Sequence, residues 1–370
     1  MPTGAKHLLE KIRALPLPEH VRIMNVCGGH ERSISMAGLR SALPANIELI
    51  PGPGCPVCIC PEEDIYLAIQ MAIHEEIVLL AFGDMLRVPV NVPKAALRTL
   101  EQAKASGADI RPIASPTEAV NIALACPDKT IVFFVAGFET TCAPVAAMLA
   151  QGIPDNLLML MSGRLTWPAV ALLLASDTPA FDALIAPGHV ATIMGAEEWR
   201  FVVEQHHIPT AVAGFTAESL LAAIYSVLRQ LIDDQLFLDN CYTQVVSPDG
   251  NSKAQLLLQS TLTVIDAPWR GIGMIPLSGL ELSPALAAHN ARLRFPDTVD
   301  AARKNAGAMP PGCDCVGVVL GKIKPNACRL YGTACTPRNP VGPCMVSDEG
   351  ACRIWWAAGI KSSLSTKEEK

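Results

Sequence analysis

Charged and aromatic residues are scarce in this chain, at 17% and 5% of its 370 residues, whereas half of the residues are hydrophobic. Such a composition excludes a disordered chain and predicts buried sheets. The formal net charge is −6. An acidic chain lacks the basic face that non-specific nucleic-acid binding requires, so no nucleic-acid partner is expected.

Long apolar runs are also missing. Glu139, Arg164 and Asp177 interrupt the best candidates before they reach the length that a bilayer requires. The first 17 residues include three basic side chains and no apolar core, so no secretory signal is visible. We therefore expect a cytoplasmic protein that does not enter a membrane.

Cysteine is abundant, with 13 residues. An odd number cannot pair completely within one chain. In a reducing compartment, cysteines in such numbers indicate metal, cluster or redox chemistry rather than structural disulfides.

Apolar runs alternate with helical periodicity along the first 240 residues, which predicts an α/β fold with doubly wound, Rossmann-like parallel sheets. Helices are expected at 33–43, 65–73, 94–106 and 217–236, and strands at 21–26, 47–50, 76–84, 110–113, 130–136, 157–161, 183–186 and 210–213. The pattern restarts near residue 129, so we expect two α/β domains at 20–128 and 129–240. Glycine, proline and cysteine then become frequent, which predicts a third, loop-rich region at 241–370.

The strongest chemical signal lies in that third region. Cys313, Cys328, Cys335 and Cys352 are separated by 14, 6 and 16 residues. Four thiolates suit a [4Fe–4S] cluster. A structural zinc normally takes its ligands from two tight knuckles, which these gaps fit poorly. Cys315 is a rival first ligand, and spacing alone does not separate it from Cys313.

A second cysteine group, Cys55-Pro56-Val57-Cys58, stands between a strand and a helix. A C-x-x-C pair can be redox-active, half of a zinc site, or structural. The proline between the thiols and the helix that follows favour redox use. Cys60 is interpreted as a bystander.

Polar residues follow several other predicted strands. Cys27-Gly28-Gly29-His30 could supply a nucleophile with a base or a soft metal ligand, although a buried structural thiol is equally compatible. Asp84, Glu139 and His189 also follow strands, and each alone is more often structural. The G-x-G-x-x-G and Walker patterns of nucleotide-binding loops are absent. Convergence at one sheet edge favours a shared site.

Taken in order, these motifs resemble the HypD family, the iron–sulfur scaffold proteins of [NiFe]-hydrogenase maturation. The resemblance covers about residues 20 to 355 and rests on the segments 27–30, 52–58, 82–89, 137–141, 186–190, 212–215, 269–273, 278–279 and 345–347, together with the C-terminal cysteine spacing counted from Cys313.

The resemblance implies two α/β domains and a cluster-bearing region, and it implies a HypC-type chaperone and a HypE-type cyanide donor as partners. It implies that Cys27 holds an iron on which cyanide and carbonyl ligands are assembled. By the same resemblance, Cys55 and Cys58 are a redox pair connected to a [4Fe–4S] cluster. His30, Asp84, Glu139 and His189 belong to the expected catalytic set.

The chain departs from the family pattern in its first motif, where Glu31-Arg32 replaces the usual Thr-His. Arg32 places a fixed positive charge where a titratable ring is usual. Two other functions stay open from sequence: an iron–sulfur-dependent thiol–disulfide oxidoreductase acting on a protein partner, and a binding scaffold in which the cluster only folds the third region.

Overall fold

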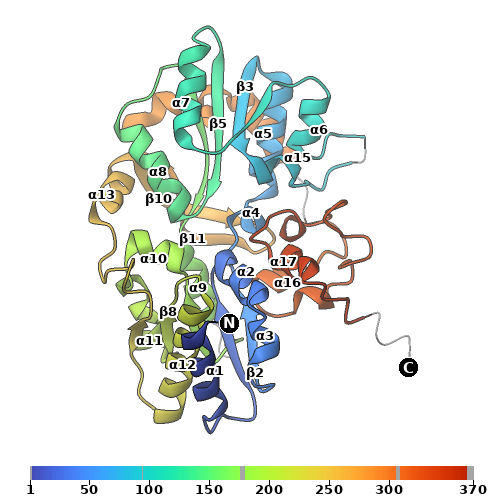
Figure 1. The fold of residues 1–370 in the computed structure, drawn as a ribbon. Coiled ribbons are helices and arrows are strands. Elements are labelled where there is room, and N and C mark those ends of the chain that lie inside the picture. Colours follow the sequence, from blue (N-terminus) through green and yellow to red (C-terminus); the bar gives the residue numbers. More distant parts are fainter. Residues whose placement is uncertain (1, 94, 176–179, 306–308, 365–370) are drawn as a thin grey trace.

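The computed structural model describes residues 2–93, 95–175, 180–305 and 309–364, and it contains two sheets (Figure 1). The first sheet has the strand order β2-β1-β7-β8-β9, and all its strands are parallel. Its strands are β1 (Val21–Asn25), β2 (Ile47–Pro51), β7 (Ala183–Ala186), β8 (Thr210–Val212) and β9 (Leu238–Asn240).

The second sheet has the order β10-β11-β6-β5-β3-β4. Four strands are parallel, and an antiparallel hairpin extends them on the side of β6. The strands are β3 (Ile77–Phe82), β4 (Ile110–Ile113), β5 (Thr130–Gly137), β6 (Leu157–Arg164), β10 (Leu262–Trp269) and β11 (Gly273–Leu282). The expected α/β class with two mostly parallel sheets is thus confirmed.

The sheets do not follow the expected units 20–128 and 129–240. β1 and β2 join the sheet of β7 to β9, while β3 to β6 form the other sheet. The chain therefore crosses between the sheets after β2, after β6 and after β9. Apolar alternation identifies each strand but carries no information on its neighbour, and so the sequence suggested contiguous units.

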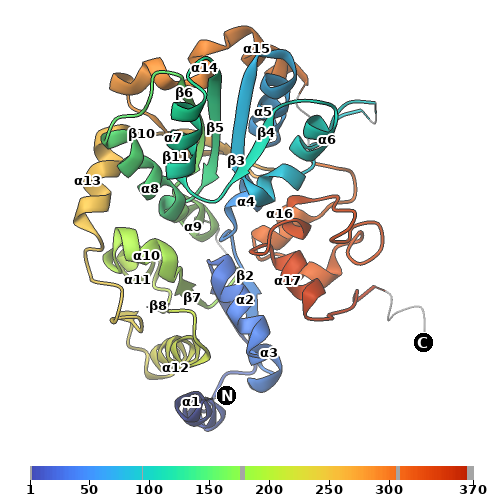
Figure 2. The ribbon, with the colours of Figure 1, turned by 45° about the horizontal axis from the view of Figure 1, so that its top comes forward.

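Helices cover both sheets and fill the space between them (Figure 2). α1 packs on α12 beside the first sheet, and α5 packs on α15 beside the second. The helices are α1 (Thr3–Arg13), α2 (Gly28–Met36), α3 (Leu39–Ala42), α4 (Pro56–Ile59), α5 (Glu62–His74), α6 (Leu100–Ala105), α7 (Pro116–Ala125), α8 (Glu139–Ala150), α9 (Thr166–Leu174), α10 (Gly188–Met194), α11 (Arg200–His206), α12 (Ala217–Asp233), α13 (Ser252–Thr261), α14 (Ala291–Arg294), α15 (Pro296–Asn305), α16 (Cys315–Val319) and α17 (Ala351–Ala357).

Several local expectations differ from the structure, and of the helix expected at 94–106 only Leu100–Ala105 is helical among the described residues. The helix expected at 33–43 begins earlier, at Gly28, and breaks at Gly38, whose φ of +65° is a left-handed conformation that glycine adopts without strain. The region 241–370 is also more ordered than expected, because α13 and the β10–β11 hairpin belong to it. Only 309–364 is loop-rich, and α16 and α17 lie beside α2 and α4 in Figure 1.

The first crossover, between β2 and β3, is anchored by buried ion pairs at the start of α5. Glu62 accepts a hydrogen bond from Arg270 at 2.5 Å. Asp64 accepts from Arg292 at 2.7 Å and from Ser162 at 2.6 Å, and Arg164 lies 3.5 Å away. These contacts join the segment that follows the Cys55–Cys58 loop to the second sheet and its hairpin.

No helix in the described part of the chain is long and apolar enough to span a membrane.

The Asp64 network provides a test of this anchor. Burial raises the pKa of Asp64, but Arg292, Arg164 and Ser162 outweigh burial, so the pKa is lowered overall and the carboxylate stays charged. Asp64→Asn leaves two arginines without their counter-charge, and we expect it to cost about 3–5 kcal/mol. The midpoint of thermal unfolding, measured by calorimetry, should fall by several degrees.

Glu63→Gln is the matched control, because Glu63 is the adjacent acid and pairs with Arg303 at the exposed surface. It should change stability by less than about 1 kcal/mol. Equal effects of the two substitutions would contradict the anchoring role of Asp64.

Candidate functional site

The loops that follow strands of both sheets meet at one cavity of about 100 Å³. Cys27 and His189 reach it from β1 and β7 of the first sheet, and Thr140 and Thr166 reach it from β5 and β6 of the second. Glu349 of the C-terminal segment completes the lining. We call this space the thiol–threonine cavity.

Cys27 and His189 lie next to each other in this cavity. The Sγ of Cys27 lies 3.8 Å from Nδ1 of His189, whose ring stacks on Phe215 with centroids 3.9 Å apart. Burial raises the pKa of the Cys27 thiol to about 12, and burial also lowers the pKa of His189. Both groups are therefore neutral near pH 7, so a soft metal ion must displace the thiol proton when it binds.

Close backbone packing fixes Cys27 in place. The N–H of Gly28 donates to the carbonyl of Gly54 at 3.0 Å. A Cβ atom on Gly54 would lie 2.4 Å from the backbone nitrogen of Cys27, and one on Gly28 would lie 2.4 Å from Cβ of Glu349. These two glycines thus permit a contact that no other residue allows.

A second and smaller cavity, about 20 Å³, adjoins the other side of Cys27. Cys55, Cys58 and Cys344 line it together with Cys27 and Glu31. Cys55 and Cys58 are joined by a disulfide, with their Cα atoms 5.3 Å apart. We call this space the four-cysteine cavity, because it brings thiols from three separate segments together.

Six cysteines gather in the C-terminal segment. Cys313 is hydrogen-bonded to Cys315, and Cys344 contacts both Cys315 and Cys352. Cβ on Gly342 would lie 2.6 Å from the Sγ of Cys313 and 2.5 Å from that of Cys315, so both thiols face the same glycine. The buried cysteines Cys328 and Cys335 belong to the same apolar core cluster as Cys315, Cys344 and Cys352.

This gathering suits iron–sulfur chemistry by its donors. All are thiols in an apolar setting, and glycine leaves space where two of them meet. The sulfur atoms contact one another directly, and no three His, Cys, Asp or Glu side chains in the described part of the chain are spread around a ready metal position. Cys315 is buried and contacts Cys344 and Cys352, whereas Cys313 is partly exposed and contacts Cys315.

The remaining expected residues lie around these cavities rather than in them. His30 is fully buried, its Nε2 lies 2.9 Å from the carbonyl oxygen of Ala213, and burial lowers its pKa to about 4. Asp84 is exposed and accepts from the hydroxyl of Ser347 at 3.3 Å, which joins the second sheet to the C-terminal segment. Cys60 is buried beside Ser162, with 3.4 Å between Sγ and Oγ.

Glu139 acts on the thiol–threonine cavity through Thr166. Its carboxylate accepts from the backbone N–H of Thr166 at 2.6 Å and from its hydroxyl at 2.8 Å. Burial raises the pKa of Glu139 to about 7. The side chain therefore holds a cavity residue in position and titrates near neutral pH.

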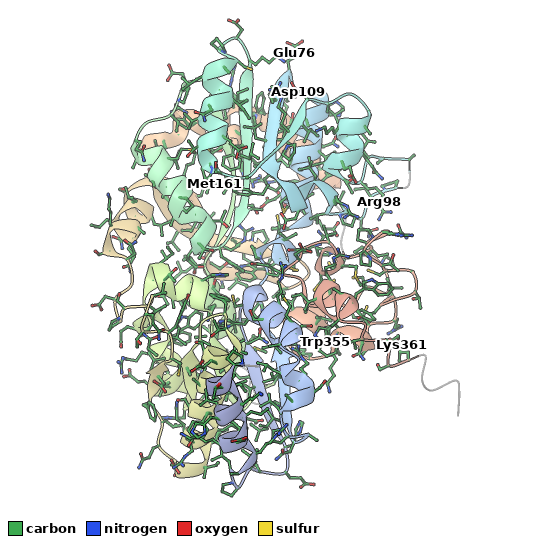
Figure 3. All side chains as sticks on the ribbon, in the orientation of Figure 1. Glu76, Arg98, Asp109, Met161, Trp355 and Lys361 are labelled. Carbon is green, nitrogen blue, oxygen red and sulfur yellow. A yellow bond between two sulfur atoms is a disulfide. The ribbon has the colours of Figure 1, made fainter. Side chains whose placement is uncertain are left out.

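Glu31 is a site residue whose role the sequence did not show. It accepts from Asn25 at 3.0 Å, from Arg40 at 2.6 Å and from the indole N–H of Trp355 at 2.6 Å. Trp355 lies on α17, the helix that also carries Cys352 (Figure 3). Glu31 thus joins the helix that begins after Cys27 to the cysteine-rich segment.

Three other lining residues were missed as well: Thr166, Cys344 and Glu349. Neither Thr166 nor Glu349 stands in a motif of distinctive spacing, and Cys344 lies outside the four-cysteine spacing that marks the third region. Arg32 lies outside both cavities, in a groove with Met36, Asp348 and Arg353 between α2 and α17.

Loops from two sheets that meet at buried thiols define a cysteine-rich α/β protein. A family model described as "HypD: Hydrogenase formation hypA family" matches residues 3–359. The chain is 39% identical over 367 residues to hydrogenase maturation factor HypD of Rhizobium leguminosarum bv. viciae, with 96% of this chain and 93% of the relative covered.

Other relatives are similar along their whole length. The chain is 36% identical over 360 residues to HypD of Escherichia coli (strain K12), covering 95% of this chain and 93% of that protein. It is 37% identical over 355 residues to a putative hydrogenase expression/formation protein of Methanocaldococcus jannaschii, covering 95% and 96%. The chain belongs to the HypD family of hydrogenase maturation factors.

The packing at Gly54 can be tested directly. Gly54→Ala would force the added methyl group against the backbone of Cys27, and such overpacking typically costs about 1–3 kcal/mol. We expect a lower thermal midpoint and faster alkylation of Cys27, measured by mass spectrometry after a timed pulse of iodoacetamide. In Gly83→Ala the new methyl group meets no atom within 4 Å, so both readouts should match the wild type. Unchanged alkylation of Cys27 in Gly54→Ala would contradict the close contact.

The raised pKa of Glu139 predicts a pH dependence of stability. Between its ordinary value of 4.5 and about 7, the folded protein keeps this proton while the unfolded chain has lost it. Glu139 therefore contributes its full stabilisation of the folded state at low pH. This contribution decreases as the pH rises from 4.5 to about 7. Glu139→Gln removes the titration, so the variant should gain about 2 kcal/mol relative to the wild type between pH 5 and 8. Calorimetry at several pH values measures this, and a difference independent of pH would contradict burial of the carboxyl group.

Proposed function

We propose that this protein is the scaffold on which an iron ion receives its cyanide and carbonyl ligands during [NiFe]-hydrogenase maturation. In this proposal a HypC-type chaperone shares the iron, a HypE-type protein donates cyanide, and the complex acts in the cytoplasm. The observation that carries the proposal is the four-cysteine cavity, where Cys27, Cys55 and Cys58 meet Cys344 of the cysteine-rich segment.

Cys27 is the proposed ligand of the incoming iron. Low-spin iron with cyanide ligands prefers soft thiolate donors. Nδ1 of His189, 3.8 Å away, is the nearest group that can take the thiol proton when the metal binds. Thr140 and Thr141 line the same cavity, and their hydroxyl groups suit the cyanide nitrogen as hydrogen-bond donors.

Cys313, Cys328, Cys335 and Cys352 are the proposed ligands of a [4Fe–4S] cluster, with Cys315 as the rival of Cys313. When bound, such a cluster supplies one electron at a time. Cys344 touches Cys352 and also lines the four-cysteine cavity, so it lies between the proposed ligand set and the Cys55–Cys58 pair. This arrangement supports a path of sulfur atoms that brings reducing equivalents towards Cys27.

A thiol–disulfide oxidoreductase acting on a protein partner fits less well. Cys55 is 6% exposed and Cys58 3%. A sulfur atom that attacks a disulfide on another protein must be accessible to it. Burial of both sulfur atoms therefore favours an internal redox partner.

Vibrational spectroscopy tests the proposal. The protein is purified anaerobically together with its HypC-type and HypE-type partners, and infrared bands of cyanide and carbonyl ligands are recorded with the iron content. We expect the wild type to show these bands and about four additional irons per chain. Cys27→Ala should lose the bands and keep those four irons.

Cys142→Ala is the control, because this thiol is equally buried but lies on α8, where it donates to the carbonyl of Gly137. It should retain both signals. Ligand bands that persist in Cys27→Ala would exclude Cys27 as the ligand, and a colourless protein loaded with zinc would exclude the cluster.

A further inference from the structure

Arg270 lies in the tight turn between β10 and β11, next to the Cys55–Cys58 loop. It is 4% exposed. Its backbone N–H donates to the carbonyl of Ile59 at 2.9 Å, and its Nη2 donates to Glu62 at 2.5 Å and to the carbonyl of Pro89 at 2.7 Å. The turn is thus tied to the end of α4, directly after the disulfide.

The rest of this guanidinium group is unsatisfied. Nε and Nη1 are buried and have no hydrogen-bond partner among the described residues. Leaving a buried charged donor without an acceptor destabilises the folded protein. Glu62 neutralises the charge of Arg270 but occupies only one of its three nitrogen atoms.

The neighbours of this turn belong to the cysteine-rich segment. A Cβ atom on Gly271 would lie 2.3 Å from Cγ2 of Val316 and 2.9 Å from Cγ of Met309, so the turn packs directly on α16 and the residues before it. Cys315 is the first residue of α16.

We propose that Arg270 is a positioning residue that sets the reduction potential of the cluster held by the cysteine-rich segment. Its Nε–H and Nη1–H groups, which have no partner among the described residues, would be free to donate to sulfur once a cluster is bound, and its fixed charge would stabilise the reduced state. The inference rests on the proposed function, because it requires that a cluster is bound there.

The step on which Arg270 would act is the one-electron reduction of the cluster. One electron from a low-potential donor is added to the protein-bound cluster, and no covalent bond forms or breaks. The added negative charge meets a fixed positive charge in a dry interior, where screening is weak. Net charge and hydrogen bonds to sulfur are two of the factors that set the potentials of such clusters.

The test is a redox titration of the anaerobically purified protein with dithionite, followed by electron paramagnetic resonance. At the potential where half of the wild-type protein is reduced, the ratio of reduced to oxidised protein should fall at least about tenfold in Arg270→Met, which corresponds to about 59 mV. Arg270→Lys keeps the charge, so in this variant the ratio of reduced to oxidised protein should fall by less than about threefold. Glu62→Gln removes the counter-charge and should shift the ratio in the opposite direction.

Two further variants control for folding and for general charge loss. Glu62→Gln/Arg270→Met removes both members of the ion pair and leaves no unpaired buried charge, so it controls for misfolding of the single variant. Because it also removes the free donors of Arg270, the ratio should shift in the same direction as in Arg270→Met but by less. Arg292→Met also removes a buried arginine, one that pairs with Asp64 and Glu281 instead, and it should leave the midpoint unchanged.

The outcomes separate the two proposals. An unchanged midpoint in Arg270→Met or in the double variant, with normal iron and sulfide content, overturns the role of Arg270 and leaves the scaffold function standing. An equal shift of the midpoint in Arg292→Met also overturns the role of Arg270. A wild-type protein without an iron–sulfur signal overturns both proposals.

Discussion

Buried ion pairs at the start of α5 are the constraint on which the site depends. The chain leaves the first sheet after β2, passes through the Cys55–Cys58 loop and enters the second sheet at β3. Glu62 and Asp64 hold this passage to the second sheet through three arginines that lie far away in sequence. Because the disulfide loop lies on the connection itself, its position is set by both sheets at once.

The facing carboxyl edges of two parallel sheets explain why the chemistry lies where it does. Each strand ends in a loop that can carry a polar group, and here loops from both sheets meet around Cys27. The cysteine-rich segment covers the junction from the side and supplies Glu349 and Cys344. The chain belongs to the HypD family, and in this arrangement Cys27, the Cys55–Cys58 disulfide and the cysteine-rich segment are neighbours.

Many of the strands and several of the site residues could be predicted from the sequence. Strands such as 183–186 were correctly located because a buried parallel strand is a short, continuous apolar run. The sequence could not assign strands to sheets, since pairing depends on contacts between distant residues. It also missed Thr166 and Glu349, which are ordinary residues until folding brings them to Cys27. Glu31 was noticed only as a departure from the family pattern, and its contacts with Arg40 and Trp355 depend on the tertiary structure.

Because the chain crosses between the sheets three times, the surroundings of Cys27 are completed only late in synthesis. β1 pairs with β7, whose first residue leaves the ribosome long after Cys27. The second sheet is likewise incomplete until β11 has been synthesised. Contacts this distant in sequence form slowly, and the early strands must wait for their partners. Cys27 therefore stays in an unfinished pocket during translation, and the complete set of groups around it exists only after almost the whole chain has folded.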